Sequence, residues 1–158
     1  MQPPRTGSQA GEPGAPDARM AAWRAFLMAH ARIARALEAE LQAEQGMSLA
    51  DYEVLLQLAR ADERRMRMSE IAERMVLSRS GATRVVDRLE SSELVRRISC
   101  ESDRRGAWAQ LTDAGYLRLR GASPTHLAGV ARHFWDKIPA DELERLRESL
   151  ESVAEGCP

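Results

Sequence analysis

The stretch SEIAERMVLSRSGATRVVDRLESSELVRRISCESDRRGAWAQLT, residues 69–112, decides the fold. Its apolar spacing predicts two short amphipathic helices a few residues apart, followed by two strands joined by a loop that contains DRRG. Such a helix pair is typical of a helix-turn-helix, whose second helix lies in the DNA major groove. The basic loop forms a wing that could reach the neighbouring minor groove.

Serines are expected to cap both helices, Ser69 the first and Ser78 the second. The strands are expected at Leu94–Ser99 and Ala107–Thr112. The seven residues between them, Cys100–Gly106, are too many for a tight hairpin turn, so the loop should project. On the second helix, one face is apolar and should point inward: Ala82, Val85, Val86 and Leu89.

Composition agrees with a mainly helical protein. Of 158 residues, 44% are hydrophobic but only 4% are aromatic, so the core must be built from Leu, Ala, Val, Ile and Met. The net charge is -1, but residues 64–105 hold eleven arginines and seven acidic residues, a local net charge of +4. A local basic face suits phosphate binding, although a solvated charged surface would give the same count.

The flanking segments should be a flexible tail and dimerisation helices. Residues 1–16 are rich in Pro and Gly and predict the tail, and Asp17 should cap a long helix over Ala18–Glu44 that stops at Gly46. We therefore divide the chain into residues 1–16, an N-terminal dimerisation helix at 17–46, a DNA-binding domain at 48–112 and C-terminal dimerisation helices at 113–156. The long helix carries a heptad-like apolar stripe of Met20, Trp23, Leu27, His30, Ala34, Leu37 and Leu41.

Between and after these segments, the chain offers further helix signals. Ser48 should start a helix, and a charged turn is expected at Asp62–Arg65. In the C-terminal region, Pro124 should kink or break the helix, and Pro139 suits the start of the last helix. That last helix has a second apolar stripe at Leu143, Leu146, Leu150 and Val153.

The order of elements resembles the MarR family of winged helix-turn-helix regulators. The resemblance rests on LSRSGATRVVDRLE at 77–90, LVRR at 94–97 and DRRGAWAQLTDAG at 103–115. It implies a mainly α fold with a small β wing, and a homodimer whose terminal helices interlock while two winged domains bind a palindromic duplex operator. Many family members also bind a small phenolic or carboxylate effector and then release DNA.

Two features depart from the family pattern. Glu93 stands where the family usually has Gly at the end of the recognition helix, so the local geometry could differ. Cys100 and Cys157 match neither the first-helix cysteine of the family's peroxide sensors nor a redox pair, which argues against thiol sensing.

The predicted DNA-binding residues lie on the second helix and the wing. Within the wing, Arg105 resembles the family's minor-groove arginine and Asp103 the carboxylate that orients it. A solvated helix face and turn are the alternative. The full set is Ser78, Arg79, Ser80, Thr83, Arg84, Arg88, Asp103, Arg104 and Arg105.

An effector is expected between the first helix, the Ser48 helix and the region after Asp113. The predicted contacts are Trp23, His30, Tyr52 and Asp51, although Trp23 and His30 could equally fill a dimer core. No metal or other cofactor is expected, because neither the three histidines nor the two cysteines have ligand spacing.

These patterns predict a ligand-responsive regulator, most simply a repressor, and not an enzyme, because no Gly-rich phosphate loop, HExxH or GxSxG occurs. No signal peptide or membrane-spanning run is evident, so we expect a cytoplasmic protein. Two alternatives stay open: a constitutive or architectural DNA-binding protein without small-molecule control, and a protein-interaction module with a degenerate winged helix.

Overall fold

The computed structural model describes the backbone of residues 17–100 and 103–156, and the side chains of those residues outside 99–106. The chain divides into two compact units, the first ending at Arg32 and the second beginning at Ile33. The elements follow one another as α1 (Ala18–Gln45), α2 (Leu49–Arg60), η1 (Asp62–Arg64), β1 (Arg65–Arg67), α3 (Met68–Arg74), α4 (Arg79–Ser91), β2 (Val95–Cys100), β3 (Asp103–Leu111), α5 (Asp113–His133), η2 (Trp135–Lys137) and α6 (Leu143–Glu155). The mainly α fold with a small β wing is confirmed.

The helix ends agree with most of the capping predictions. The Asp17 carboxylate accepts the Arg19 N–H at 3.1 Å, and α1 ends before Gly46, whose φ is 57°. The Ser48 hydroxyl accepts the Asp51 N–H at 3.1 Å, and the Ser78 hydroxyl accepts the Gly81 N–H at 3.0 Å, each from the residue three positions later.

The predicted cap at Ser69 is wrong. Helix α3 begins two residues earlier than predicted, at Met68, with Arg67 in the capping position. Here the Glu70 carboxylate accepts the Arg67 N–H at 3.0 Å. A carboxylate in the first turn of α3 therefore binds the N–H of the residue that precedes the helix, as the Glu of a capping box does.

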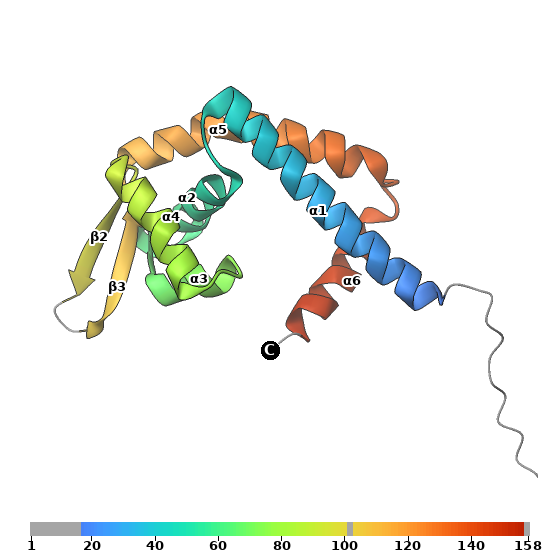
Figure 1. Ribbon diagram of the computed structural model, residues 1–158, viewed down its shortest axis with the longest axis horizontal. Coiled ribbons are helices and arrows are strands. Elements are labelled where there is room, and N and C mark those ends of the chain that lie inside the picture. The colour runs from blue at the N-terminus through green and yellow to red at the C-terminus, as the bar shows by residue number, and fades with distance from the viewer. Residues whose placement is uncertain (1–16, 101–102, 157–158) are drawn as a thin grey trace, which may run out of the picture. The chain divides into compact units, whose positions relative to one another are not determined.

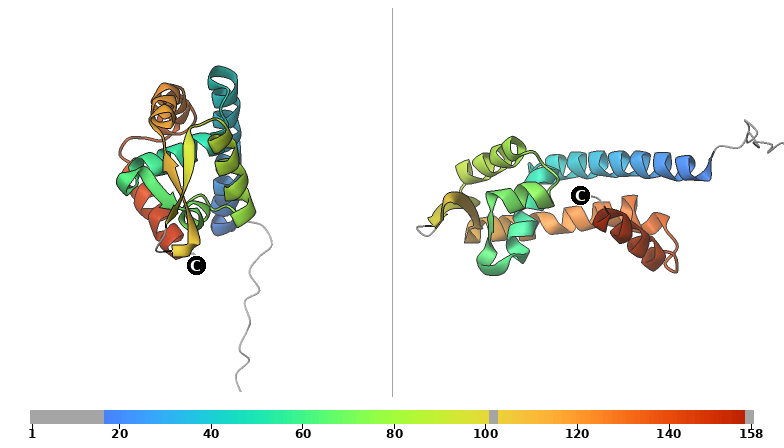
Figure 2. Two further views of the ribbon diagram at one scale, coloured as in Figure 1. Left: turned by 90° about the vertical axis from the view of Figure 1, so that its left-hand side faces the viewer. Right: turned by 90° about the horizontal axis from the view of Figure 1, so that it is seen from below.

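The sheet has three antiparallel strands in the order β1-β3-β2. Strand β1 was not predicted, because Arg65–Arg67 is short and charged and lies where a turn was expected. It pairs along β3, with Met66 opposite Ala109 and Arg67 opposite Trp108. In Figure 1 the β2–β3 hairpin projects beside α4, and the left-hand view of Figure 2 shows its two strands crossing.

The hairpin loop is shorter than predicted. Backbone pairing between β2 and β3 continues past a register shift at Ser99/Cys100 and reaches Cys100 opposite Asp103. The expected seven-residue loop is therefore wrong, since strand pairing takes up most of it. Polar and glycine residues in this stretch hid the strand signal, because only one face of a wing needs to be apolar.

Helix α5 continues through Pro124, so of the predicted kink or break at this residue the break is absent. A proline removes only one backbone donor, and neighbouring contacts hold the helix on both sides. The Ser123 hydroxyl donates to the Leu119 carbonyl at 2.8 Å, and the Thr125 hydroxyl donates to Glu44 of α1 at 3.0 Å. The last helix, α6, begins at Leu143 and not at Pro139, whose carbonyl instead accepts the Glu142 N–H in a turn.

The core of the second unit lies among α2, α3, α4, the inner face of the sheet and the first half of α5. Its fully buried side chains come from every one of these elements or from the end of α1: Leu41, Val54, Leu55, Leu58, Ile71, Val86, Ala109 and Ala122. Trp108 lies on the other face of the sheet, half-buried, with the guanidinium carbons of Arg65 and Arg67 at 5.3 and 5.1 Å from its ring centroid. The core thus fixes α4 with one face inward and one face exposed.

Candidate nucleic-acid interface

Helix α4 separates its apolar residues from its polar ones. Ala82, Val85, Val86 and Leu89 are buried as predicted. The opposite face is exposed over its first half and carries Arg79, Ser80, Thr83 and Arg84. The Thr83 hydroxyl donates to the Arg79 carbonyl at 2.9 Å, which fixes its rotamer along the helix. The helix N-terminus and these side chains therefore share one exposed surface.

The arginines of this helix differ in what they contact. Within the described part of the chain, neither Arg79 nor Arg84 makes an ion pair. Arg88, one turn after Arg84, donates from Nε and Nη2 to the Asp51 carboxylate on α2. Two positive charges thus stay uncompensated on the exposed face of α4, and a third is neutralised. An uncompensated cation at the surface is suited to a phosphate or a guanine edge.

Strand β2 fixes the C-terminal half of α4. Arg97 lies 2.6 Å from the Asp87 carboxylate and 2.8 Å from that of Glu90, while the Arg97 N–H donates to Glu90 at 3.1 Å. A groove lies beside this link and is lined by residues of β1, α3, α4 and the hairpin, among them Arg67, Arg79, Thr83 and Arg97. The recognition helix and the wing therefore border one arginine-rich groove.

The side chains of Asp103, Arg104 and Arg105 lie outside the described residues. Only their backbone is given, at the start of β3. Their predicted roles at the wing tip stay predictions, as does any role of Cys100 and Cys157.

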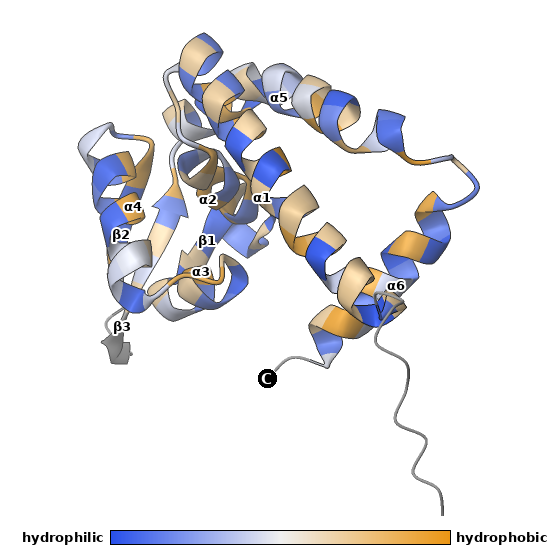
Figure 3. Ribbon diagram, turned by 45° about the vertical axis from the view of Figure 1, so that its right-hand side comes forward, coloured by the Kyte–Doolittle hydropathy of each residue, from blue (hydrophilic) through white to orange (hydrophobic). Residues whose placement is uncertain are grey.

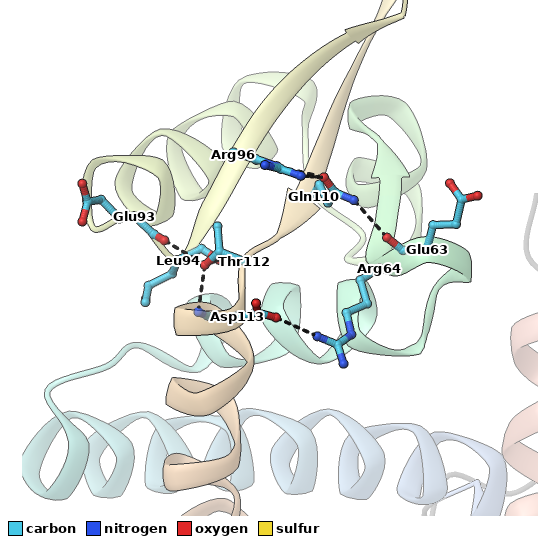
Figure 4. Close-up of polar contacts among 9 residues, drawn as sticks. Glu63, Arg64, Glu93, Leu94, Arg96, Gln110, Thr112 and Asp113 are labelled. Atoms are coloured by element: carbon cyan, nitrogen blue, oxygen red, sulfur yellow. Dashed lines mark hydrogen bonds and ion pairs between the residues drawn. The ribbon is translucent and has the colours of Figure 1, made fainter.

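Thr112 ties the base of the wing to two helices (Figure 4). Its hydroxyl lies 2.8 Å from the Glu93 carbonyl and 3.0 Å from that of Leu94, and accepts the Gly115 N–H at 2.9 Å as the cap of α5. Glu93 itself has a φ of 58°, the left-handed conformation that glycine favours. The chain therefore keeps the left-handed backbone conformation at the end of α4, although a glutamate stands where the family usually has glycine.

The four predicted effector residues lie in different surroundings. Trp23 and His30 belong to the first unit, where both are exposed and flank Phe26 with ring centroids 6.0 and 6.3 Å from it. In the second unit, Tyr52 is buried and stacks on His126 with centroids 4.3 Å apart, and Asp51 is paired with Arg88.

His126 was not among the predicted site residues. Its Nδ1 atom is buried and has no hydrogen-bond partner among the described residues, and burial lowers the pKa of the imidazole. Sequence spacing gave no signal for it, because Tyr52 and His126 are far apart in the chain and meet only where α2 packs on α5.

Among the described residues, no group of His, Cys, Asp and Glu side chains is arranged to hold a metal ion. No helix in the described ranges is long and apolar enough to span a bilayer.

Known proteins share this arrangement. The sequence model of the MarR family matches residues 45–106. The crystal structure of AbsC, a MarR family transcriptional regulator from Streptomyces coelicolor, is 38% identical, with a TM-score of 0.81, over 91% of this chain and 97% of AbsC. The chain belongs to the MarR family. Sco3205, a MarR family regulator of the same organism solved in complex with DNA, is 34% identical with a TM-score of 0.84, over 93% of this chain and 92% of Sco3205.

Curated relatives match a shorter region of the chain. The HTH-type transcriptional regulator MhqR of Bacillus subtilis (strain 168) is 31% identical over 86 residues, or 54% of this chain. The chain spans about three-fifths of the length of the first curated relatives that it matches. These relatives are transcriptional regulators and not enzymes, in agreement with the prediction for this MarR-family chain.

Proposed function

We propose that this chain is a transcriptional repressor that binds a palindromic duplex operator as a homodimer. The observation that carries the proposal is the exposed face of α4, where Arg79 and Arg84 make no ion pair with any described residue and lie beside a groove bordered by the wing. The 34% identical relative Sco3205, which has the same fold and was solved in complex with DNA, supports DNA as the partner. Ser78, Arg79, Ser80, Thr83 and Arg84 would enter the major groove, and Asp103, Arg104 and Arg105 would act at the minor groove.

The test uses an operator selected from random duplexes with the full-length protein. If Arg84 contacts a base edge, Arg84→Ala should weaken binding by about 1–3 kcal/mol and relax the preference at one position in each half-site. Arg105→Ala should weaken binding and reduce the salt slope by about one, as expected for the loss of one phosphate-like contact. Fluorescence anisotropy at several salt concentrations measures both effects.

Arg120→Ala is the matched control, since Arg120 is an exposed arginine on α5. It should leave affinity and slope unchanged, and every variant should keep the wild-type melting temperature. Unaltered binding by both Arg84→Ala and Arg105→Ala would reject the proposed DNA interface.

Effector control is the second part of the proposal. The stack of Tyr52 on His126 supports it, because the buried Nδ1 atom, which has no hydrogen-bond partner among the described residues, could hydrogen-bond a phenol or carboxylic acid. Trp23, His30 and Asp51 stay predicted contacts from sequence. An effector can change DNA affinity only through different affinities for the DNA-bound and free arrangements, and about 1.4 kcal/mol per dimer would change it tenfold.

Titration with salicylate and with urate tests this part. Either compound should change tryptophan fluorescence and weaken operator binding over the same concentration range. His126→Phe should keep the aromatic stack, abolish the response and leave basal operator affinity intact. If no compound perturbs fluorescence or binding, the constitutive DNA-binding alternative is favoured.

A further inference from the structure

The ion pair between Arg88 and Asp51 joins the recognition helix to α2. The Arg88 Nε atom lies 3.1 Å from each carboxylate oxygen, and Nη2 lies 2.6 Å from Oδ1. Asp51 is only 8% exposed, and its own N–H donates to the Ser48 hydroxyl in the first turn of α2. The carboxylate therefore has a fixed position, and the guanidinium is held by a bidentate contact.

A second carboxylate reinforces this junction. Glu38 on α1 accepts the Leu49 N–H at 2.7 Å, which places it at the N-terminus of α2. Hydrogen bonds and charge from Asp51, and charge from Glu38, raise the pKa of Arg88 against the opposing effect of burial. Helices α1, α2 and α4 thus converge on two carboxylates and one guanidinium, all within the second unit.

Arg88 differs from Arg84 because it would have to give up an ion pair in order to contact DNA. Its side chain is about half exposed, so exposure alone does not distinguish it from Arg84. To reach a phosphate, however, its guanidinium would have to leave Asp51, and a nearly buried carboxylate would stay without its cation. Arg84 meets no such cost, since it has no ion-pair partner among the described residues.

We propose that Arg88 is a positioning residue that, through Asp51, sets the angle at which α4 presents Arg79, Thr83 and Arg84, and that it does not contact DNA. With Arg97 bound to Asp87 and Glu90, the C-terminal half of α4 is fixed from α2 on one side and from β2 on the other. The proposal rests on the proposed DNA-binding function and gives both Arg88 and Asp51 roles that differ from those predicted by sequence.

The experiment compares two duplexes of equal length, one selected by the wild-type protein from random sequences and one unselected. The variants are Asp51→Asn, Arg88→Gln and their double. Each single variant should weaken binding to the selected duplex by about tenfold, since sequence readout needs the correct angle of α4. Binding to the unselected duplex and the salt slope should stay at wild-type values, because no phosphate contact is lost.

The double variant tests whether the two residues act as one unit. The double variant should lose no more affinity than either single variant. If the two residues acted independently, the fold-losses of the two single variants would multiply. Arg88→Lys keeps the charge but not the bidentate geometry, so it should bind between wild type and Arg88→Gln. If Arg88→Gln does not fold, Asp51→Asn and Arg88→Lys carry the test, each checked by thermal melting.

Two results would overturn the proposal. A salt slope that falls by about one in Arg88→Gln but not in Asp51→Asn would make Arg88 a phosphate contact. Wild-type affinity for the selected duplex in folded Asp51→Asn and Arg88→Gln would remove the positioning role. Failure of the DNA-binding function itself would differ from both, because Arg84→Ala would then also bind like wild type.

Discussion

Val76 and Glu93 occupy equivalent positions, directly after the caps of α3 and α4, with φ angles of 51° and 58°. After α3, the Val76 N–H donates to the Glu73 carbonyl at 3.0 Å and the Leu77 N–H to the Ala72 carbonyl at 2.8 Å. These two bonds form a Schellman motif, in which glycine usually takes the left-handed position. Valine is disfavoured there because its branched Cβ crowds the backbone.

Replacing Val76 with glycine should therefore stabilise the protein. The valine side chain is 93% exposed, so its removal loses no packing. Relief of about 1–2 kcal/mol of left-handed strain should exceed the extra entropy that glycine gives the unfolded chain. We expect Val76→Gly to raise the free energy of unfolding by about 0.5–1 kcal/mol, measured by urea denaturation.

Glu73→Gly is the matched control for this substitution. Glu73 is exposed in the last turns of the same helix but has a helical conformation, so glycine there should lower the free energy of unfolding by about 1 kcal/mol. Destabilisation by Val76→Gly similar to that by Glu73→Gly would mean that the left-handed position carries no strain.

At the scale of elements, the junction between the wing and α5 depends on one close approach. Gly115 is buried in the first turn of α5, and Figure 4 shows Thr112 linking this turn to the carbonyls that follow α4. A Cβ atom on Gly115 would overlap the Leu94 carbonyl oxygen and lie 2.7 Å from Leu111 Cδ1. The backbone of Leu94 cannot move away without breaking its hydrogen bond from Thr112 N–H, which is 3.1 Å long.

Gly115→Ala should therefore lower the free energy of unfolding by about 3 kcal/mol, at the upper end of overpacking effects. Gly121 provides the control on the same helix, because a Cβ atom there meets nothing within 4 Å. Gly121→Ala should stabilise by about 1 kcal/mol through helix propensity. Urea denaturation of both variants measures the difference, and equal effects of the two would refute the close approach.

Helices were predictable from sequence where an apolar stripe and a polar cap coincide. The predicted end of α1 is one residue short, and the Ser48 and Ser78 caps form as expected. Strand β1 was missed because its pairing partner lies about forty residues along the chain, and three charged or apolar residues carry no periodicity of their own. Continuity through Pro124 depends on tertiary contacts with Glu44 and Gln45, which local rules do not contain.

For the whole molecule, the sequence located the candidate interface but could not distinguish the arginines that are free to contact DNA from the one that is held by another helix. Arg84 and Arg88 are four residues apart and therefore lie on nearly the same face of α4. Only the fold brings Asp51 to Arg88 and leaves Arg84 without an ion pair among the described residues. The same holds for His126, whose contact with Tyr52 exists only once α5 packs on α2.

The exposed apolar stripes of α1 and α6 predict that the molecule functions as a homodimer. In α1, large apolar side chains are 43–52% exposed over a short stretch, namely Met20, Trp23, Phe26, Leu27 and Met28. Helix α6 exposes Leu150 and Val153, and Figure 3 shows apolar and charged residues alternating along it. Stripes of this kind on two separate helices are typical of surfaces that a second chain covers.

Leu27→Glu combined with Leu146→Glu should therefore convert the dimer to a monomer or an unfolded chain, since each substitution places a charge in an apolar contact without a partner. Light scattering measures the mass, and circular dichroism separates a folded monomer from an unfolded chain. Ala25→Glu is the control, because Ala25 is exposed on the face of α1 opposite the stripe, so this variant should stay dimeric. A stable dimer of the double variant would show that these stripes are not the dimer interface. That result would leave the DNA-binding proposal for α4 untouched.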